Sequence, residues 1–201
     1  MHQSPANLEF LQRQGISAVE GKSVSASSGQ ISTAYSVVVG EPKMQSPLVA
    51  FVAMPFVEKT DGYAKGFFDE VIRNLITPAA VEAGFRVQTA RREGSDVIHS
   101  TIVNDILQAD IVIADLTEHN PNVLFELGLR MASEKPICLI KAKNTLPIFD
   151  VDNLLRVLDY DANLWRSTLD IDIPRLVAHI KGSWESRETA PSYMKILRKS
   201  Q

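Results

Sequence analysis

From Pro47 onward, short apolar runs alternate with longer amphipathic segments, and this alternation restricts the fold more than any other feature of the chain. Each run is almost continuously apolar, as in strands that are buried on both faces of a parallel sheet. Amphipathic segments between such strands are typical of helices that cross over the sheet. The predicted strands are residues 48–54, 85–90, 110–115, 136–141 and 156–160.

The amphipathic segments contain helix starts and stops. The first is a long helix that Pro78 bends or splits and that Gly84 ends. The second begins at a Ser95 cap, the third begins at Asn120 with a proline in its first turn, and residues 164–180 form a closing helix. The residues at helical spacing are Tyr63, Phe67, Val71 and Leu75 in the first helix and Ile98, Ile102 and Ile106 in the second.

Together these elements predict an α/β fold with right-handed crossovers. The expected architecture is a flavodoxin-like three-layer sandwich whose five-stranded parallel sheet has the order 2-1-3-4-5. Residues 1–47 differ from this pattern, because they contain nine serines and too little apolar surface to hold a fold alone. We expect an N-terminal extension that packs on its own domain or on a second copy of the chain, one domain over residues 48–181, and a C-terminal tail over residues 182–201.

The composition argues against several classes of function. The formal net charge of -3 provides no field that attracts a polyanion, so nucleic acid is a poor candidate partner. The single cysteine, Cys138, cannot form an internal disulfide, and no group of residues has metal-ligand spacing. No apolar stretch approaches the roughly 20 residues that span a bilayer. We therefore expect a cytoplasmic protein that uses no metal and no cofactor.

Ligands of doubly wound sheets bind beyond the carboxyl ends of the strands. The loop after the first predicted strand has neither a GxGxxG nor a GxxxxGK motif, so a dinucleotide fingerprint and a Walker phosphate loop are unsupported. After the second strand, Arg91 and Arg92 could hold a phosphate or a carboxylate, or could be solvated surface. After the third, Asp115 could accept hydrogen bonds from a ligand or act as the turn residue of the following loop.

The helix after the third predicted strand, NPNVLFELGLRMASEKP, is the most informative segment. Asn122, Glu126 and Arg130 fall in a row beside its apolar stripe. Glu126 therefore lies about one and a half turns into a helix whose N-terminus points at the crevice. Spacing alone favours the alternative of an exposed ion pair between Glu126 and Arg130. Gly128 weakens the helix interior, which hints at close approach by backbone or ligand.

Three segments together, VAFVAMPF, IxxxIxxADIVIADLT and NPNVLFELGLRMA, resemble the nucleoside 2-deoxyribosyltransferase-like superfamily and the bacterial TIR-like proteins that share its architecture. The resemblance covers residues 48–160, and its most specific part is DLTEHNPNVLFELG. It implies that Glu126 is the catalytic carboxylate for breaking an N-glycosidic bond. It further implies that Asp115 helps to bind the nucleoside and that Phe56 stacks on the base.

The implied chemistry is departure of a base from C1′ of a ribose through an oxocarbenium-like transition state. Glu126 either attacks C1′ or stabilises the cation, as carboxylates do in retaining glycosidases. Nicotinamide leaves as a neutral base without a proton donor, whereas adenine or cytosine needs one, for which His119 and Asp115 are the candidates. A phosphate held by Arg91 or Arg92 would favour nucleotides or NAD over free nucleosides.

We therefore expect an N-glycosidase that cleaves a nucleotide, with NAD as the favoured substrate. The resemblance implies a nucleotide-depleting effector of bacterial antiphage defence, active as a homo-oligomer or with an activating partner. Alternatives are a nucleoside 2-deoxyribosyltransferase, a (deoxy)nucleoside monophosphate N-glycosidase, and a noncatalytic nucleotide-sensing or scaffolding module. The transferases carry Gly-Thr where this chain has Asn122 and Val123, which disfavours base exchange. The expected substrate-binding residues are Met54, Pro55, Phe56, Arg91, Arg92, His119, Asn120 and Asn122.

Overall fold

The computed structural model describes residues 46–59, 62–89 and 98–199 of the 201-residue chain. The predicted N-terminal extension and the predicted Ser95 cap lie outside the described residues. From Pro47 onward the chain forms one compact unit. The fold described below is that of this unit.

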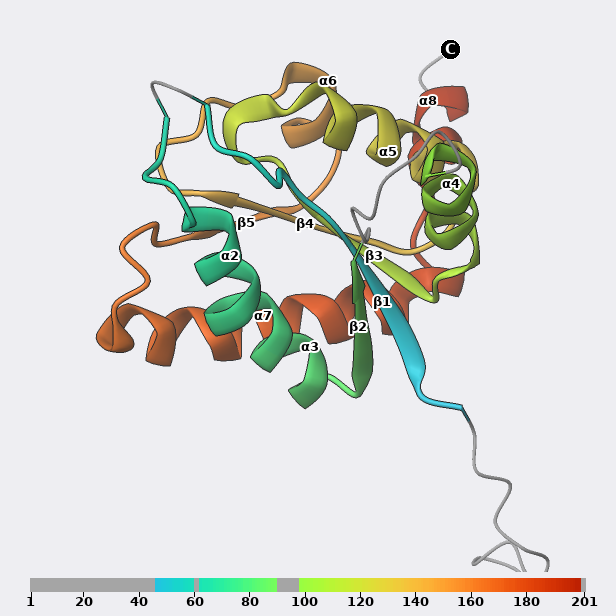
Figure 1. The fold of residues 1–201 in the computed structure, drawn as a ribbon. Coiled ribbons are helices and arrows are strands. Elements are labelled where there is room, and N and C mark those ends of the chain that lie inside the picture. The colour runs from blue at the N-terminus through green and yellow to red at the C-terminus, as the bar shows by residue number, and fades with distance from the viewer. Residues whose placement is uncertain (1–45, 60–61, 90–97, 200–201) are drawn as a thin grey trace, which may run out of the picture. The chain divides into compact units, whose positions relative to one another are not determined.

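Five parallel strands form one sheet in the order β2-β1-β3-β4-β5, which confirms the predicted α/β architecture (Figure 1). Ala50 pairs with Val87 of β2 on one side and with Ile111 of β3 on the other, so that β1 lies inside the sheet. Each predicted strand is present, and its described ends lie within one residue of the prediction. The strands are β1 Leu48–Ala53, β2 Phe85–Thr89, β3 Ile111–Asp115, β4 Ile137–Ala142 and β5 Val157–Tyr160.

Helices cover both faces of the sheet and complete the three layers (Figure 1). One face carries α2 Phe67–Val71, the π-helical turn η1 Ile72–Ile76, α3 Thr77–Glu82 and α7 Arg166–Glu185. The other face carries α4 Ile98–Gln108, α5 Pro121–Ala132 and α6 Phe149–Asp152, with α8 Tyr193–Lys199 packed against α5. Short 3₁₀ turns are η2 Thr117–His119 and η3 Ser186–Glu188.

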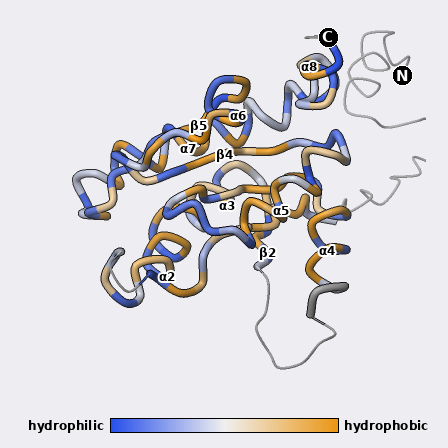
Figure 2. Tube along the Cα trace, turned by 90° about the horizontal axis from the view of Figure 1, so that it is seen from above, coloured by the Kyte–Doolittle hydropathy of each residue, from blue (hydrophilic) through white to orange (hydrophobic). Residues whose placement is uncertain are grey.

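The two cores share the central strands, because alternate residues of a strand point to opposite faces. Ala50 and Val52 of β1 pack on the face of α2, α3 and α7, whereas Phe51 and Ala53 pack on the face of α4 and α5. Figure 2 shows β4 as hydrophobic along most of its length, in contrast to the hydrophilic surface segments. Burial on both faces explains why the strands are continuous apolar runs in the sequence.

The first helix begins later than predicted. α2 starts at Phe67, so Tyr63 lies in the preceding turn and not on the helix. Gly66, with a φ of 89°, occupies the left-handed conformation just before the helix, which prevents the helix from extending back to Tyr63. Pro78 is the second residue of α3 and follows the π-helical turn, so the hydrogen-bond pattern changes near this proline, which has no N–H to donate, while the backbone stays helical at Ile76 and Thr77. Gly84 ends the segment in the left-handed conformation, as predicted.

The closing helix is longer than predicted. α7 runs to Glu185 and therefore passes residue 181, where the sequence places the end of the domain. Its additional turns are held by packing, since the Trp184 ring lies edge-on against Phe85 of β2 with 5.7 Å between ring centroids. After α7, the Ser192 hydroxyl donates to the Glu134 carboxylate at 3.0 Å, which places α8 beside the end of α5.

Arg130 anchors α5 to the elements around it. Its guanidinium is fully buried and donates to the backbone carbonyls of Ile106 at 2.7 Å, Ala109 at 3.0 Å and Asp110 at 2.9 Å. Its Nε donates to the Pro136 carbonyl at 3.2 Å. Desolvation lowers the pKa of Arg130 to about 10, with the nearby Asp110 charge opposing the shift, so that the group stays charged at neutral pH. One side chain therefore ties α5 to the end of α4, the start of β3 and the start of β4.

Replacement of Arg130 by methionine is expected to lower the free energy of unfolding by about 2–4 kcal/mol, because buried carbonyls lose their donors. Urea denaturation followed by circular dichroism measures this change. The matched control is Arg166→Met at the exposed start of α7, where a change within about 0.5 kcal/mol is expected. Equal destabilisation of both variants would contradict the anchoring role of Arg130.

Candidate active site

The start of α5 lies at the carboxyl edge of the sheet and is built as predicted. The Asn120 Oδ1 atom accepts hydrogen bonds from the backbone N–H groups of Asn122 at 2.9 Å and Val123 at 3.4 Å. Pro121 follows as the first helical residue, where a missing N–H leaves no carbonyl unsatisfied. The Asn120 side chain is thus committed to capping the helix, while Asn122 is exposed on the first turn.

Glu126 lies in the second turn of α5 and is half-buried beside the buried Leu127. Among the described residues, its carboxylate has no hydrogen-bond or ion-pair partner. Desolvation raises the pKa of Glu126 to about 7. A carboxylate that is withdrawn from water, with no cation beside it in the described part of the chain, can be stabilised by a ligand that carries positive charge.

The alternative prediction, an exposed ion pair between Glu126 and Arg130, is wrong. The spacing of the two residues brings them to one side of the helix, but Arg130 is 0% exposed and its guanidinium turns inward to four carbonyl oxygens. Helical spacing indicates only which side chains are neighbours on one helix. It does not indicate that carbonyl oxygens at the end of α4 accept hydrogen bonds from Arg130. Glu126 is therefore left without the partner that its sequence suggests.

Asp115 ends β3 with a carboxylate that is 0% exposed. Its Oδ1 atom accepts from the Thr117 backbone N–H at 2.9 Å and from the Thr117 hydroxyl at 2.5 Å, and its Oδ2 atom accepts from the Tyr160 hydroxyl at 2.8 Å. Desolvation raises the pKa of Asp115 to about 6, although the hydrogen bonds from Thr117 and Tyr160 oppose that shift. These are the contacts of a turn residue, and nucleoside binding by Asp115 stays a prediction.

Thr117 extends this network across the carboxyl ends of three strands. Its Oγ1 atom accepts from the backbone N–H of Ala142 in β4 at 2.9 Å and lies 3.1 Å from the Tyr160 hydroxyl of β5. Because Asp115 belongs to β3, the network joins β3, β4 and β5 below the candidate site. All of its members are buried and hydrogen-bonded, which makes this edge a rigid base.

The residues after β1 divide between core and surface. Met54 and Pro55 are buried, and Met54 packs in the core on the α2 side of the sheet. Phe56 is 36% exposed. Of the three predicted substrate contacts in this loop, Phe56 is therefore the side chain that reaches the surface.

His119 is held by the loop that follows β4. Its Nε2 atom lies 2.8 Å from the Leu146 carbonyl oxygen, which accepts a hydrogen bond from the imidazole N–H. A role as proton donor to a leaving base would require this contact to break or the other ring nitrogen to act. Arg91 and Arg92, which the sequence predicts to bind the substrate, lie outside the described residues.

Two side chains at this edge were not predicted as part of the site. The Tyr63 phenol lies near the carboxylates of Asp115 and Glu118, and its pKa is raised by desolvation first and then by these two charges. Glu118, in the loop after β3, contacts the loop after β1. The sequence assigns Tyr63 to a helix through its apolar spacing and contains no signal for the conformation of Glu118.

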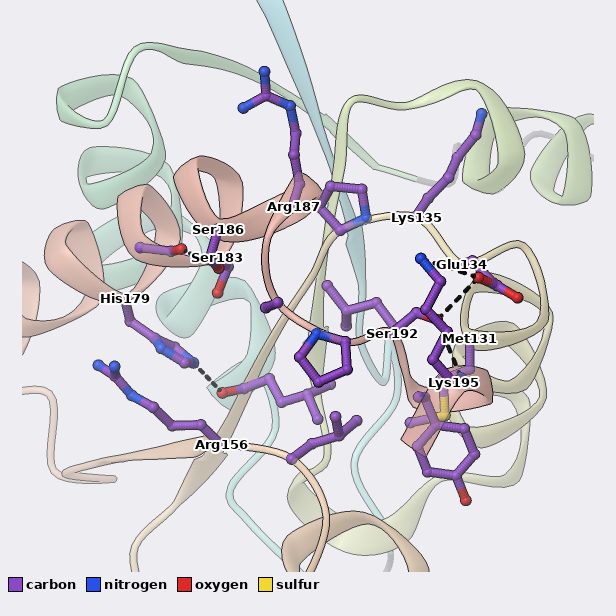
Figure 3. A pocket seen from close by; sticks show the side chains of 18 residues that line it. Met131, Glu134, Lys135, Arg156, His179, Ser183, Ser186, Arg187, Ser192 and Lys195 are labelled. Atoms are coloured by element: carbon purple, nitrogen blue, oxygen red, sulfur yellow. Dashed lines mark hydrogen bonds and ion pairs between the residues drawn. The ribbon is translucent and has the colours of Figure 1, made fainter. Parts of the chain in front are cut away.

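A pocket of about 430 Å³ lies at the opposite edge of the sheet (Figure 3). Its lining includes Lys135 and Arg156, which precede β4 and β5, so the pocket faces the amino ends of these strands. In Figure 3, His179 and Ser183 of α7 line one side, and the turn after α5 lines the other. None of the described residues predicted for the site lines this pocket. The carboxyl edge with Glu126 remains the candidate site.

The described residues can be compared with what a metal site and a membrane-spanning helix require. In the described part of the chain, no group of three or more His, Cys, Asp and Glu side chains is arranged to hold a metal ion. Every helix in the described ranges is too short or too polar to span a lipid bilayer.

Comparison with known proteins finds similarity at the level of structure. No family model and no curated protein sequence matches this chain. The chain is similar to the solved structure of a CMP N-glycosidase from Clostridium botulinum, BcmB, with 19% sequence identity and a TM-score of 0.46. The match covers 61% of this chain and 97% of the solved one.

The raised pKa of Glu126 predicts how stability depends on pH. The folded state holds a proton up to about pH 7, whereas the unfolded state releases it near 4.5, so stability falls as the pH rises between these values. Glu126→Gln removes this dependence, and we expect the variant to be more stable than the wild type above pH 7 and nearly equal to it at pH 4. Thermal melts across this pH range measure the difference.

Glu185→Gln at the exposed end of α7 is the matched control and should leave the pH profile unchanged. A Glu126→Gln profile that runs parallel to that of the wild type would show that Glu126 is not desolvated.

Proposed function

We propose that this chain is an N-glycosidase that cleaves the bond between base and ribose of a nucleotide, with NAD as its substrate. The observation that carries the proposal is the half-buried Glu126 carboxylate without a partner among the described residues. It lies at the edge of the sheet where ligands of this architecture bind. The motif DLTEHNPNVLFELG, in which Glu126 corresponds to the catalytic carboxylate of the superfamily it resembles, supports the same role.

The charge of the site favours NAD among nucleotides. The nicotinamide ring of NAD is a cation until the glycosidic bond breaks, and a desolvated carboxylate gains most from a cation. Binding of NAD therefore supplies a cationic partner that Glu126 does not have among the described residues, and lowers its pKa, so that more of the carboxylate is ionised when the substrate is in place. CMP, on which the similar solved protein acts, has a neutral base and offers no such gain.

The proposed reaction needs no proton donor for the leaving group. A carboxylate oxygen of Glu126 forms a bond to C1′ while the bond from C1′ to the ring nitrogen breaks, and its electron pair neutralises the pyridinium. Water then hydrolyses the ribosyl ester: its hydroxyl bonds to C1′ as the ester bond breaks, which releases ADP-ribose, restores the carboxylate and gives one proton to the solvent. With a cytosine or adenine base a proton donor is required, and His119 would provide it through its other ring nitrogen or after leaving the Leu146 carbonyl.

Glu126→Gln is expected to reduce the release of nicotinamide by at least about a thousandfold, because the amide cannot attack C1′ or offset its positive charge. The assay incubates the full-length protein with NAD, CMP and a panel of ribo- and deoxyribonucleotides and resolves the products by mass spectrometry. Glu185→Gln serves as the control. Release of a base by the wild type and the Glu126→Gln variant at equal rates would refute the role of Glu126.

The same panel distinguishes the alternatives. Release of free cytosine from CMP in place of nicotinamide from NAD would indicate a nucleoside monophosphate N-glycosidase. Nucleotide binding without turnover, undisturbed in Glu126→Gln, would indicate a sensing module. The antiphage role, the homo-oligomer and the activating partner stay predictions.

The dependence of the rate on pH is a separate prediction. The value of kcat/KM is expected to rise with pH and level off above about pH 7, because the free protein must ionise Glu126 before it reacts. The profile of kcat should rise at a lower pH, since bound NAD lowers the pKa of Glu126. Steady-state rates between pH 5 and 9 measure both profiles. A kcat/KM that falls with pH through the same range would show that the protonated acid is the active form.

A further inference from the structure

Glu118 has a backbone conformation that favours glycine. Its φ is 64°, and the following His119 has a φ of 48°, so two consecutive residues with side chains occupy the left-handed region. A side chain in this conformation is disfavoured by contact between Cβ and the backbone. Such positions persist where the surrounding contacts compensate for the strain, and they are frequent at functional sites. The contacts of Glu118 indicate what compensates here.

Both ends of Glu118 bind the loop that follows β1. Its carboxylate accepts from the backbone N–H of Lys59 at 3.2 Å and from that of Tyr63 at 3.4 Å. Its backbone carbonyl accepts from the Lys59 ammonium at 2.6 Å. Glu118, in the loop after β3, thus fixes the backbone of Lys59 and of Tyr63, which follow β1.

Gly62 is matched to this arrangement. A Cβ atom at Gly62 would lie 2.2 Å from Oε1 of Glu118, which is closer than any real contact. The glycine therefore allows the Glu118 carboxylate to approach the backbone of the loop.

Tyr63, one of the two residues whose backbone binds the Glu118 carboxylate, has its aromatic side chain at the carboxyl edge of the sheet. The Tyr63 ring stacks on Phe67 with 4.0 Å between ring centroids, and its phenol lies near the Asp115 carboxylate and the Thr145 side chain. Asp115 ends β3 and Thr145 follows β4, so the phenol lies at the carboxyl edge between three loops. The backbone of Tyr63 is one of the two groups that bind the Glu118 carboxylate.

We propose that Glu118 is the positioning residue of this site, and that it holds the backbone at Lys59 and Tyr63 so that the Tyr63 phenol contacts the bound nucleotide. The inference rests on the proposed function and extends it, because it names a side chain that binds the substrate and the residue that places it. Glu118 does not touch the reacting atoms, so its loss weakens substrate binding and leaves the chemical step intact.

Glu118→Gly tests this role, because glycine accepts the left-handed conformation and removes only the side chain. The melting temperature is expected to stay within about 3 °C of the wild type. Amide exchange at Lys59 and Tyr63 should be at least about tenfold faster, and KM for NAD at least about tenfold higher, with kcat within about twofold. Glu118→Gln, which keeps one acceptor oxygen, should recover protection at one of the two amides and only part of the KM.

Asn144→Gly is the matched control. Asn144 is also a residue with a left-handed φ, 71°, in the loop after β4, and its exposed side chain has no hydrogen bond to the described residues. Asn144→Gly should leave amide exchange and KM unchanged. Tyr63→Phe should raise KM without changing amide exchange at Lys59.

Unchanged exchange at Lys59 and Tyr63 in Glu118→Gly, or faster exchange with an unchanged KM, would overturn the inference. A fall in kcat alone would also overturn it, since it would place Glu118 in the chemistry. An inactive wild type would contradict the proposed function instead, and amide exchange would then still show whether Glu118 holds the loop.

Discussion

The buried guanidinium of Arg130 determines where α5 lies, and the candidate site depends on α5. Four hydrogen bonds to backbone carbonyls place this helix against the end of α4 and the starts of β3 and β4. A charge can remain buried in this way only when its donors are satisfied. Because Arg130 is fully engaged, Glu126 one turn away has no cationic partner among the residues that the structure describes, in contrast to the hydrogen-bonded guanidinium on the same helix.

The two carboxylates of the carboxyl edge differ through their surroundings. Asp115 accepts three hydrogen bonds from Thr117 and Tyr160 and joins the ends of β3, β4 and β5. Glu126 has no such donors among the described residues. Desolvation raises the pKa of both groups, but only that of Asp115 is opposed by hydrogen bonds. Asp115 thus stabilises the base of the site, and Glu126 is the group with an interaction left to make.

Much of the fold and part of the site could be predicted from the sequence. Strands buried on both faces leave continuous apolar runs, so each strand was found within one residue and the strand order followed from the crossovers. A motif indicates Glu126, whose catalytic role stays a prediction. The position of Tyr63 before the helix is not evident from the sequence, because its spacing continues an apolar helical pattern, although Gly66 keeps the helix from reaching it. Glu118 was missed because its contacts join loops that are more than fifty residues apart.

The sequence by itself determined the layers, the strand order, the cap of α5 and the position of Glu126 on that helix, because these depend on local patterns of apolar and capping residues. Only the tertiary structure decided which charged groups at the carboxyl edge have hydrogen-bond or ion-pair partners. Whether Glu126 is paired depends on the carbonyls that attract Arg130, and whether Asp115 is free depends on a tyrosine two strands away. Hydrogen bonds and desolvation act between groups that are close in space, and closeness in space is a property of the folded chain.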